Sequence, residues 1–304
     1  MTKPRLNGMV LLSAVCGFAL APREAAARTP FGVFVVAFWL LAASSSALNM
    51  WLERDTDALM ERTRDRPLAA GRLRERPVFW MGQALAVLAL GIFLLAGDWL
   101  TAGLGLLTWA SYLLVYTPLK RRTPLSLLAG AVTGALPPVM GWTAGGGSLD
   151  QAALGLFCLL FVWQVPHFLA IAALYGEQYR AAGIKVLGLV HGQAAAGRQA
   201  VIYAAALLPI SVWLYAIGLG GPVYLSVALV LGAAFVGVAV WAARRPSHAS
   251  APRSPMVVHT SLEPYFARMW GNAASGSFDP ASASKMPKDR TGKSTCASSR
   301  RKPS

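Results

Sequence analysis

Charged residues are scarce in this sequence, and so are cysteines. Only 13% of the 304 residues are charged, whereas an ordinary soluble domain carries about 25%, so a soluble globule is excluded. The three cysteines are far apart and form no CxxC pair, which excludes a disulfide framework and a cysteine zinc site. The net charge of +15 comes without any nucleic-acid-binding motif, so we predict no nucleic-acid partner.

What the sequence has in abundance is apolar runs long enough to cross a bilayer. Hydrophobic residues make up 55% of the chain, and about 20 apolar residues in a helix span the lipid core. Because that core offers no hydrogen-bond partners, such segments must be helices. The first run could imitate a signal peptide, but it lacks a convincing cleavage site. We predict an all-α, polytopic membrane helix bundle with eight spans, at about 8–22, 31–51, 78–97, 99–117, 125–144, 152–174, 200–219 and 222–243.

Lysine and arginine are concentrated in three loops that alternate along the chain. Loops 52–77, 118–124 and 175–199 follow the second, fourth and sixth predicted spans, so they lie on one face of the membrane. Only the opposite turn that contains Arg23 and Arg28 departs from this pattern. The positive-inside rule therefore places the three loops and the N-terminus in the cytoplasm.

The end of the second span carries the strongest chemical signal. Asn49, Glu53 and Asp57 recur every four residues, which places them on one face of a helix. Such oxygen-bearing side chains can bind Mg²⁺, which often joins carboxylates to phosphates. Arg62 and Arg66 follow, and guanidinium groups match phosphate oxygens in geometry and charge. The segment therefore predicts a site that stabilises a diphosphate leaving group.

A simpler interpretation of this segment is a solvated helix face held by salt bridges. Acids and bases at helical spacing often do only that. However, these acids lie at the end of a membrane span, where ionisable residues usually mark function. We therefore favour the diphosphate site.

Two other cytoplasmic loops carry weaker signals. In 175–192, Glu177 is the acid nearest the membrane and can complete a second metal site opposite Asp57. The 116–124 loop can be a topology anchor or, beside the first loop, a second phosphate clamp. Its cations are Lys120, Arg121 and Arg122.

Polar or helix-breaking residues also lie within two spans. Pro137 and Pro138 can kink their helix to open a cavity, or can serve packing alone. His167, which follows Trp163 and Gln164, can ligate heme iron or act as a base. It can equally be a histidine that hydrogen-bonds between helices.

These segments together resemble the UbiA superfamily of intramembrane prenyltransferases, and within it the heme O synthases. The resemblance covers about residues 3–243 and implies a bundle of about nine helices around a central cavity. Its most specific stretches are TKPR, NMW…D.D..M.RT..RPL..G, YT.LKRRT, GA.PP..GW and WQ.PHF.

The resemblance implies a role for each matching side chain. The catalytic metal-binding motif of the family matches Asn49, Glu53 and Asp57, with Glu53 where the family usually has Asp. Implied heme-binding residues are His167, Trp163 and Gln164. Implied diphosphate-binding residues are Arg62, Arg66, Lys120, Arg121 and Arg122.

The sequence departs from the family pattern in two places. Where the family reads like DYxxAGIPMLP, this chain reads QYRAAGIKVLG, so the uncharged Gln178 replaces an Asp and Glu177 is the remaining acid for a second metal. After Trp241 the composition becomes polar, which predicts a domain over 1–245 and a disordered tail over 246–304. A frameshifted or otherwise altered terminus would give this composition in place of the family's ninth helix.

The resemblance implies an enzyme that transfers the farnesyl group of farnesyl diphosphate to a vinyl group of heme b, with Mg²⁺ as cofactor. The products would be heme O and diphosphate, used in heme-copper oxidase biogenesis in a bacterial inner membrane. Implied partners are membrane lipid, heme A synthase and terminal oxidase assembly factors. Two alternatives stay open: a UbiA-type enzyme with another acceptor, and an inactive heme-binding paralogue.

Overall fold

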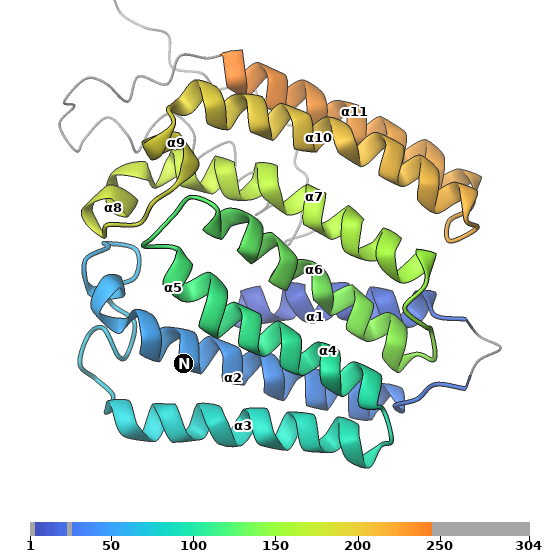
Figure 1. The fold of residues 1–304 in the computed structure, drawn as a ribbon, viewed down its shortest axis with the longest axis horizontal. Coiled ribbons are helices and arrows are strands. Elements are labelled where there is room, and N and C mark those ends of the chain that lie inside the picture. The colour runs from blue at the N-terminus through green and yellow to red at the C-terminus, as the bar shows by residue number, and fades with distance from the viewer. Residues whose placement is uncertain (1–3, 23–25, 245–304) are drawn as a thin grey trace, which may run out of the picture. The chain divides into compact units, whose positions relative to one another are not determined.

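The protein is described here by a computed structural model that covers residues 4–22 and 26–244, and this part of the chain contains helices and no strand. Figure 1 shows the long helices lying side by side. The predicted tail over 246–304 lies outside the described residues. The elements are α1 (Pro4–Leu20), α2 (Phe31–Ala58), α3 (Glu75–Leu95), α4 (Trp99–Ala110), the π-helix η1 (Ser111–Tyr116), α5 (Thr117–Leu119), α6 (Ser126–Ala144), α7 (Gln151–Leu174), α8 (Gly176–Ala181), α9 (Leu187–Val190), α10 (Gln193–Ala216) and α11 (Pro222–Arg244).

The predicted all-α membrane architecture is confirmed, with one full-length span fewer than expected. Within the described residues, 7 helices are long and apolar enough to cross a membrane. The predicted span 8–22 corresponds to α1, whose apolar stretch Asn7–Leu20 is shorter than a full span. The seven are α2, α3, the continuous segment Trp99–Leu119, α6, α7, α10 and α11.

Large apolar side chains cover the outward faces of these helices. Leu95 is 91% exposed, and Trp99 and Val223 are also largely exposed. Soluble proteins rarely present many such side chains together. Their presence along helices of spanning length makes this an integral membrane protein.

Two helices begin or end away from the predicted boundaries. The second helix continues to Ala58 instead of ending near 51, and α10 begins at Gln193 instead of near 200. Hydropathy marks only the part of a helix that lies in lipid. Alanine and glutamine are good helix formers, so the segment 193–199 extends α10 although it is too polar for a span.

Helix α6 lies at the centre of the packing. Of its apolar window 72% is buried, against 6% for α11, and it packs against α1, α4, η1 and α7. A Cβ atom on Gly141 would lie 1.8 Å from the carbonyl oxygen of Ala14, and one on Gly17 would lie 2.0 Å from that of Pro138. Because Pro137 and Pro138 are buried in this close contact between helices, the structure supports the packing interpretation of the two prolines.

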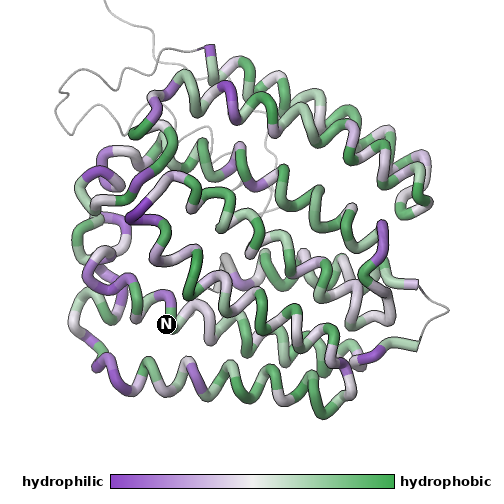
Figure 2. Tube along the Cα trace, in the orientation of Figure 1, coloured by the Kyte–Doolittle hydropathy of each residue, from purple (hydrophilic) through white to green (hydrophobic). Residues whose placement is uncertain are grey.

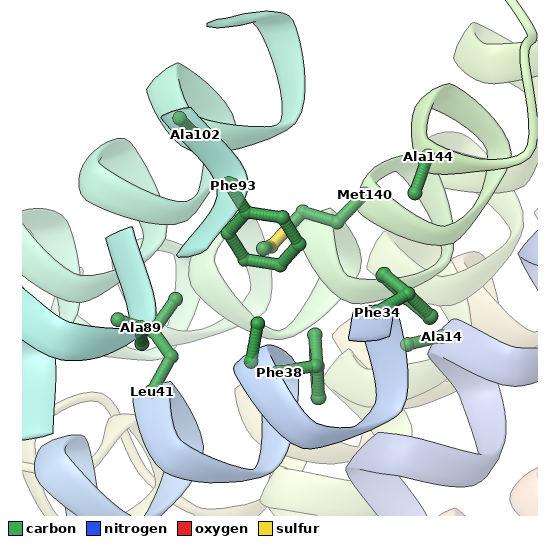
Figure 3. Close-up of a cluster of buried hydrophobic side chains, with 10 residues drawn as sticks. Ala14, Phe34, Phe38, Leu41, Ala89, Phe93, Ala102, Met140 and Ala144 are labelled. Atoms are coloured by element: carbon green, nitrogen blue, oxygen red, sulfur yellow. The ribbon is translucent and has the colours of Figure 1, made fainter. Parts of the chain in front are cut away.

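Aromatic side chains form the main core along the N-terminal half of α2. Phe34 and Phe38 of α2 contact Phe93 of α3 and Met140 of α6, together with Ala14 of α1 (Figure 3). The ring centroids of Phe34 and Phe93 are 6.3 Å apart, within the range of favourable aromatic pairs. This core holds the N-terminal half of α2 against its neighbours. The polar residues described below lie on the C-terminal half.

A buried polar network joins the connections at the end of the bundle opposite the three basic loops. The Asp98 carboxylate accepts hydrogen bonds from the Thr29 hydroxyl at 2.9 Å and the Thr101 backbone amide at 3.0 Å. Arg28 donates to the carbonyl oxygens of Thr143 at 3.0 Å and Gly147 at 2.5 Å. Arg28, an exception to the charge pattern, therefore has a structural role in this network.

The α1–α6 contact gives a first prediction. Replacing Gly141 by alanine should destabilise the protein by about 1–3 kcal/mol, because the added methyl group overpacks a tight site. The matched control is Gly103→Ala in α4, where nothing lies within 4 Å of the added carbon. Thermal unfolding of the purified protein in detergent measures both. Equal melting temperatures for the two variants would show that α1 moves away from α6 at no cost.

Candidate active site

Helix α2 is longer than a bilayer span requires, and its C-terminal end is the polar one. This helix has 28 residues and is therefore about 42 Å long, whereas the lipid core is about 30 Å thick. Glu53 and Asp57 lie in its last two turns, as predicted from their helical spacing. Hydrophilic segments gather at the same end, around α8, α9 and the α2–α3 connection (Figure 2). The acids thus occupy the border between the apolar bundle and its polar loops.

Glu53 pairs with a cation of the second basic loop. The Lys120 ammonium donates to Glu53 Oε1 at 2.7 Å and lies 4.3 Å from the centroid of the Tyr116 ring. Burial lowers the pKa of Lys120, but the neighbouring Tyr116 and the Glu53 carboxylate raise it more, so the net shift is upward. Lys120 is therefore held as a cation beside α2.

Asp57 pairs with an arginine of its own loop. Its Oδ2 atom accepts a hydrogen bond from Arg66 Nη1 at 2.5 Å, and the Asp57 side chain is only 1% exposed. The Thr63 hydroxyl donates to the Asp57 carbonyl oxygen at 2.9 Å, which turns the loop back onto the end of α2. A buried carboxylate needs such a partner, because removing one member of a buried ion pair costs about 3–5 kcal/mol.

Asn49 contacts a residue that the sequence analysis did not select. Its amide nitrogen donates to the Thr117 hydroxyl at 3.3 Å, which itself donates to the Tyr112 carbonyl oxygen at 2.8 Å. Thr117 follows the π-helix and precedes Pro118, whose ring would crowd the preceding helical turn. The sequence signal that could have identified Thr117 is a threonine followed by a proline at the end of a span.

The first and third basic loops meet above these acids. The Arg62 guanidinium lies 5.3 Å from the centroid of the Tyr175 ring, and the Arg62 backbone amide donates to Gln178 Oε1 at 3.4 Å. The second loop joins them through the Lys185 amide, which donates to the Lys120 carbonyl oxygen at 2.9 Å. All three loops therefore form one cap, and Tyr175 is a contact residue that sequence reasoning missed.

The acid predicted to complete a second metal site lies elsewhere on this cap. Glu177 is exposed and pairs with Arg180 at 2.8 Å, whereas its neighbour Gln178 contacts the first loop. Arg121 and Arg122 are exposed on the second loop. The metal role of Glu177 and the diphosphate role of these two arginines stay predictions.

The three residues predicted to bind heme separate into two environments on α7. The rings of Trp163 and His167 are stacked, with centroids 5.3 Å apart and an interplanar angle of 12°. Gln164 is instead buried against α6, where a Cβ atom on Gly134 would lie 2.0 Å from its Oε1 atom. The Trp163 and His167 rings therefore contact each other, whereas Gln164 takes part in helix packing, and the heme-binding role of the three residues stays a prediction.

The oxygen ligands on α2 are too few to hold a metal by themselves. In the ranges 4–22 and 26–244, no group of three or more His, Cys, Asp and Glu side chains is placed to bind one. The α2 face offers two carboxylates and the amide of Asn49. This set fits Mg²⁺, which is usually held by one or two carboxylates together with substrate phosphates and water.

Comparison with known proteins defines the class to which this fold and site belong. The model of the UbiA prenyltransferase family matches residues 10–261, and the chain belongs to this family. A UbiA homologue from Archaeoglobus fulgidus, solved with DMAPP and Mg²⁺, has the same fold, with a TM-score of 0.66, 18% identity and coverage of 85% of this chain and 93% of that chain. An apo UbiA homologue from Aeropyrum pernix has a TM-score of 0.61 at 20% identity, covering 80% and 93% of the two chains.

Curated relatives narrow the comparison within the family. The chain is 44% identical over 240 residues to the protoheme IX farnesyltransferase of an Anaeromyxobacter species, covering 79% of this chain and 80% of that protein. It is 42% identical over 241 residues to the protoheme IX farnesyltransferase of Myxococcus xanthus, covering 79% and 82%. Paracoccus denitrificans has a relative of the same name at 36% identity over 239 residues, covering 78% and 77%.

The loop cap gives a second prediction. Replacing Tyr175 by leucine removes the ring under Arg62, which is worth about 0.5–1 kcal/mol at an exposed site. Backbone amides of the loop after α2 should then exchange about two- to fivefold faster with deuterium, whereas Tyr175→Phe should leave their rates unchanged. Identical exchange in Tyr175→Leu and the parent protein would mean that the ring does not restrain the loop.

Proposed function

We propose that this protein transfers the farnesyl group of farnesyl diphosphate to a vinyl group of heme b, giving heme O and diphosphate. The observation that carries the proposal is the pairing of Glu53 with Lys120 and of Asp57 with Arg66 at the end of α2. Relatives that share up to 44% of the aligned residues are named protoheme IX farnesyltransferase, which supports heme as the acceptor.

Binding of the prenyl diphosphate begins with charge. Lys120 and Arg66 lie within 2.7 Å of the α2 carboxylates, so phosphate oxygens beside these carboxylates would also be within reach of both cations. Arg62 lies on the same loop cap, against the Tyr175 ring. Guanidinium and ammonium donors hold phosphate oxygens and neutralise the charge that develops as the diphosphate departs.

The oxygen atoms of Asn49, Glu53 and Asp57 would hold Mg²⁺ next to the diphosphate. The metal, when bound, acts as a Lewis acid that stabilises the leaving group. The bond between C1 of the farnesyl chain and the diphosphate oxygen breaks, and the electron pair leaves with the diphosphate. The allylic cation that remains is protected from water by the apolar bundle until an acceptor reaches it.

The acceptor would bind near the paired rings on α7. We assign Trp163 and His167 to the heme site, since their rings stack on each other and a further aromatic plane, such as the macrocycle, can stack on the same pair. The vinyl π electrons attack C1 of the farnesyl cation, and the new cation beside the macrocycle takes up water and loses a proton. The product is hydroxyethylfarnesyl heme.

The membrane position follows from the charge pattern of the loops. The cap carries Arg62, Lys120 and Lys185, which by the positive-inside rule supports a cytoplasmic position for it, and we propose that the membrane is a bacterial inner membrane. Farnesyl diphosphate would enter from that side. Heme A synthase and oxidase assembly factors are the partners that would use the product.

The direct test is production of heme O in cells that lack any other source of it. Membranes from a strain deleted for its own enzyme and carrying this chain should contain heme O by pigment extraction and mass spectrometry. Heme binding without heme O or released diphosphate would indicate the inactive paralogue instead. Prenylation of a different acceptor in a panel with labelled farnesyl diphosphate would identify another UbiA-type activity.

Two neighbouring acids provide a third prediction. Asp57→Asn should lower heme O formation by about 100-fold or more, because a carboxylate that would hold the Mg²⁺ beside the leaving group is lost. Asp55→Asn is the matched control, since the Asp55 side chain is 83% exposed and points away from the site. Initial rates in membranes, normalised to protein amount, measure both. Equal rates for the two variants would remove Asp57 from the proposed mechanism.

A further inference from the structure

Each carboxylate proposed to hold the metal is paired with a cation proposed to hold the diphosphate. Glu53 contacts Lys120 at 2.7 Å, and Asp57 contacts Arg66 at 2.5 Å. All four side chains are largely buried, with exposed fractions between 1% and 19%. The ligand-binding groups of the site therefore neutralise one another.

This arrangement makes binding of either ligand alone unfavourable. A metal ion that takes Glu53 and Asp57 leaves Lys120 and Arg66 buried without their counter-charges. A diphosphate that takes the two cations draws them away from the carboxylates with which they pair. An uncompensated buried charge is costly, so each ligand alone must meet that cost.

We propose that the two ion pairs act as a charge-exchange lock that makes binding of the divalent cation and of the diphosphate mutually dependent. When both bind, the metal replaces the cations beside Glu53 and Asp57, and the phosphate oxygens replace the carboxylates beside Lys120 and Arg66. Every charge keeps a partner, so the pair of ligands binds where neither binds well alone. This inference rests on the proposed function of the site and makes each of its two ligands depend on the other.

The position of the cations explains how the exchange takes place. Arg66 and Lys120 belong to loops, whereas Glu53 and Asp57 belong to the rigid helix α2. The exchange therefore requires movement of loop side chains and leaves α2 in place. Because coupling between two ligands is reciprocal, each should raise the affinity for the other by the same factor.

The first experiment measures metal binding in the absence of any diphosphate. Mn²⁺ serves as the probe, and its free concentration is followed by electron paramagnetic resonance with the purified full chain. Lys120→Met should bind Mn²⁺ about tenfold more tightly than the parent protein, within the usual range of coupling between ligands. The matched control is Lys185→Met, which removes an exposed cation of the same cap and keeps the backbone contact to Lys120.

The control separates the lock from general electrostatics. Any lost positive charge raises cation affinity slightly, so Lys185→Met reports that background. An equal increase in both variants, or none in either, overturns the proposal. Lys120→Gln repeats the measurement with a different side chain, and size-exclusion profiles and melting temperatures establish that each variant is folded.

The reciprocal experiment measures inorganic pyrophosphate binding without metal, in EDTA. Glu53→Gln should bind pyrophosphate about tenfold more tightly than the parent protein, because Lys120 is released from its partner. Glu61→Gln, an exposed acid of the same segment, is the control. Unchanged or weaker pyrophosphate binding in Glu53→Gln contradicts the lock.

These binding measurements do not depend on turnover. If the variants show neither increase in affinity while the parent protein forms heme O, the lock is rejected and the enzyme assignment is kept. If both affinities rise as expected but no heme O forms, the diphosphate site is kept and the assignment of the acceptor is rejected.

Discussion

The charge balance at the end of α2 organises the functional end of this protein. Asp57 is buried and requires Arg66, which folds the following segment back over the helix. Glu53 requires Lys120, which holds the segment after α5 against the same helix. The Lys120 carbonyl then receives the Lys185 amide. Two carboxylates thereby position three loops that lie far apart in the sequence, at 52–77, 118–124 and 175–199.

The remainder of the bundle keeps that helix rigid. Aromatic and aliphatic side chains pack around the N-terminal half of α2, and α6 holds α1 through contacts that only glycine permits. The π-helix η1 presents Thr117 to Asn49 without ending the span. The carboxylates therefore lie on a fixed helix, and the cations that pair with them lie on the adjoining loops.

Much of this could be predicted from the sequence because the strongest signals are local. Apolar run length predicts the spans, and four-residue spacing predicts the common face of Asn49, Glu53 and Asp57. The extension of α2 to Ala58 and the early start of α10 were missed, since hydropathy is insensitive to helix outside lipid. Cross-loop contacts such as Arg62 with Tyr175 were also missed. Such contacts depend on which cation of one loop lies beside which side chain of another loop, and a single sequence does not predict that pairing.

The hydrogen bonds of Arg28 affect how membrane topology is predicted from charge. Its guanidinium donates to two backbone carbonyls in a polar network on the face that has few cations. An arginine whose donors are engaged by peptide groups is less available to anionic lipid headgroups, and so it carries little information about the leaflet beside it. Counting only cations whose donors are not engaged in this way would strengthen the asymmetry between the two faces and give a cleaner orientation signal for chains of this kind.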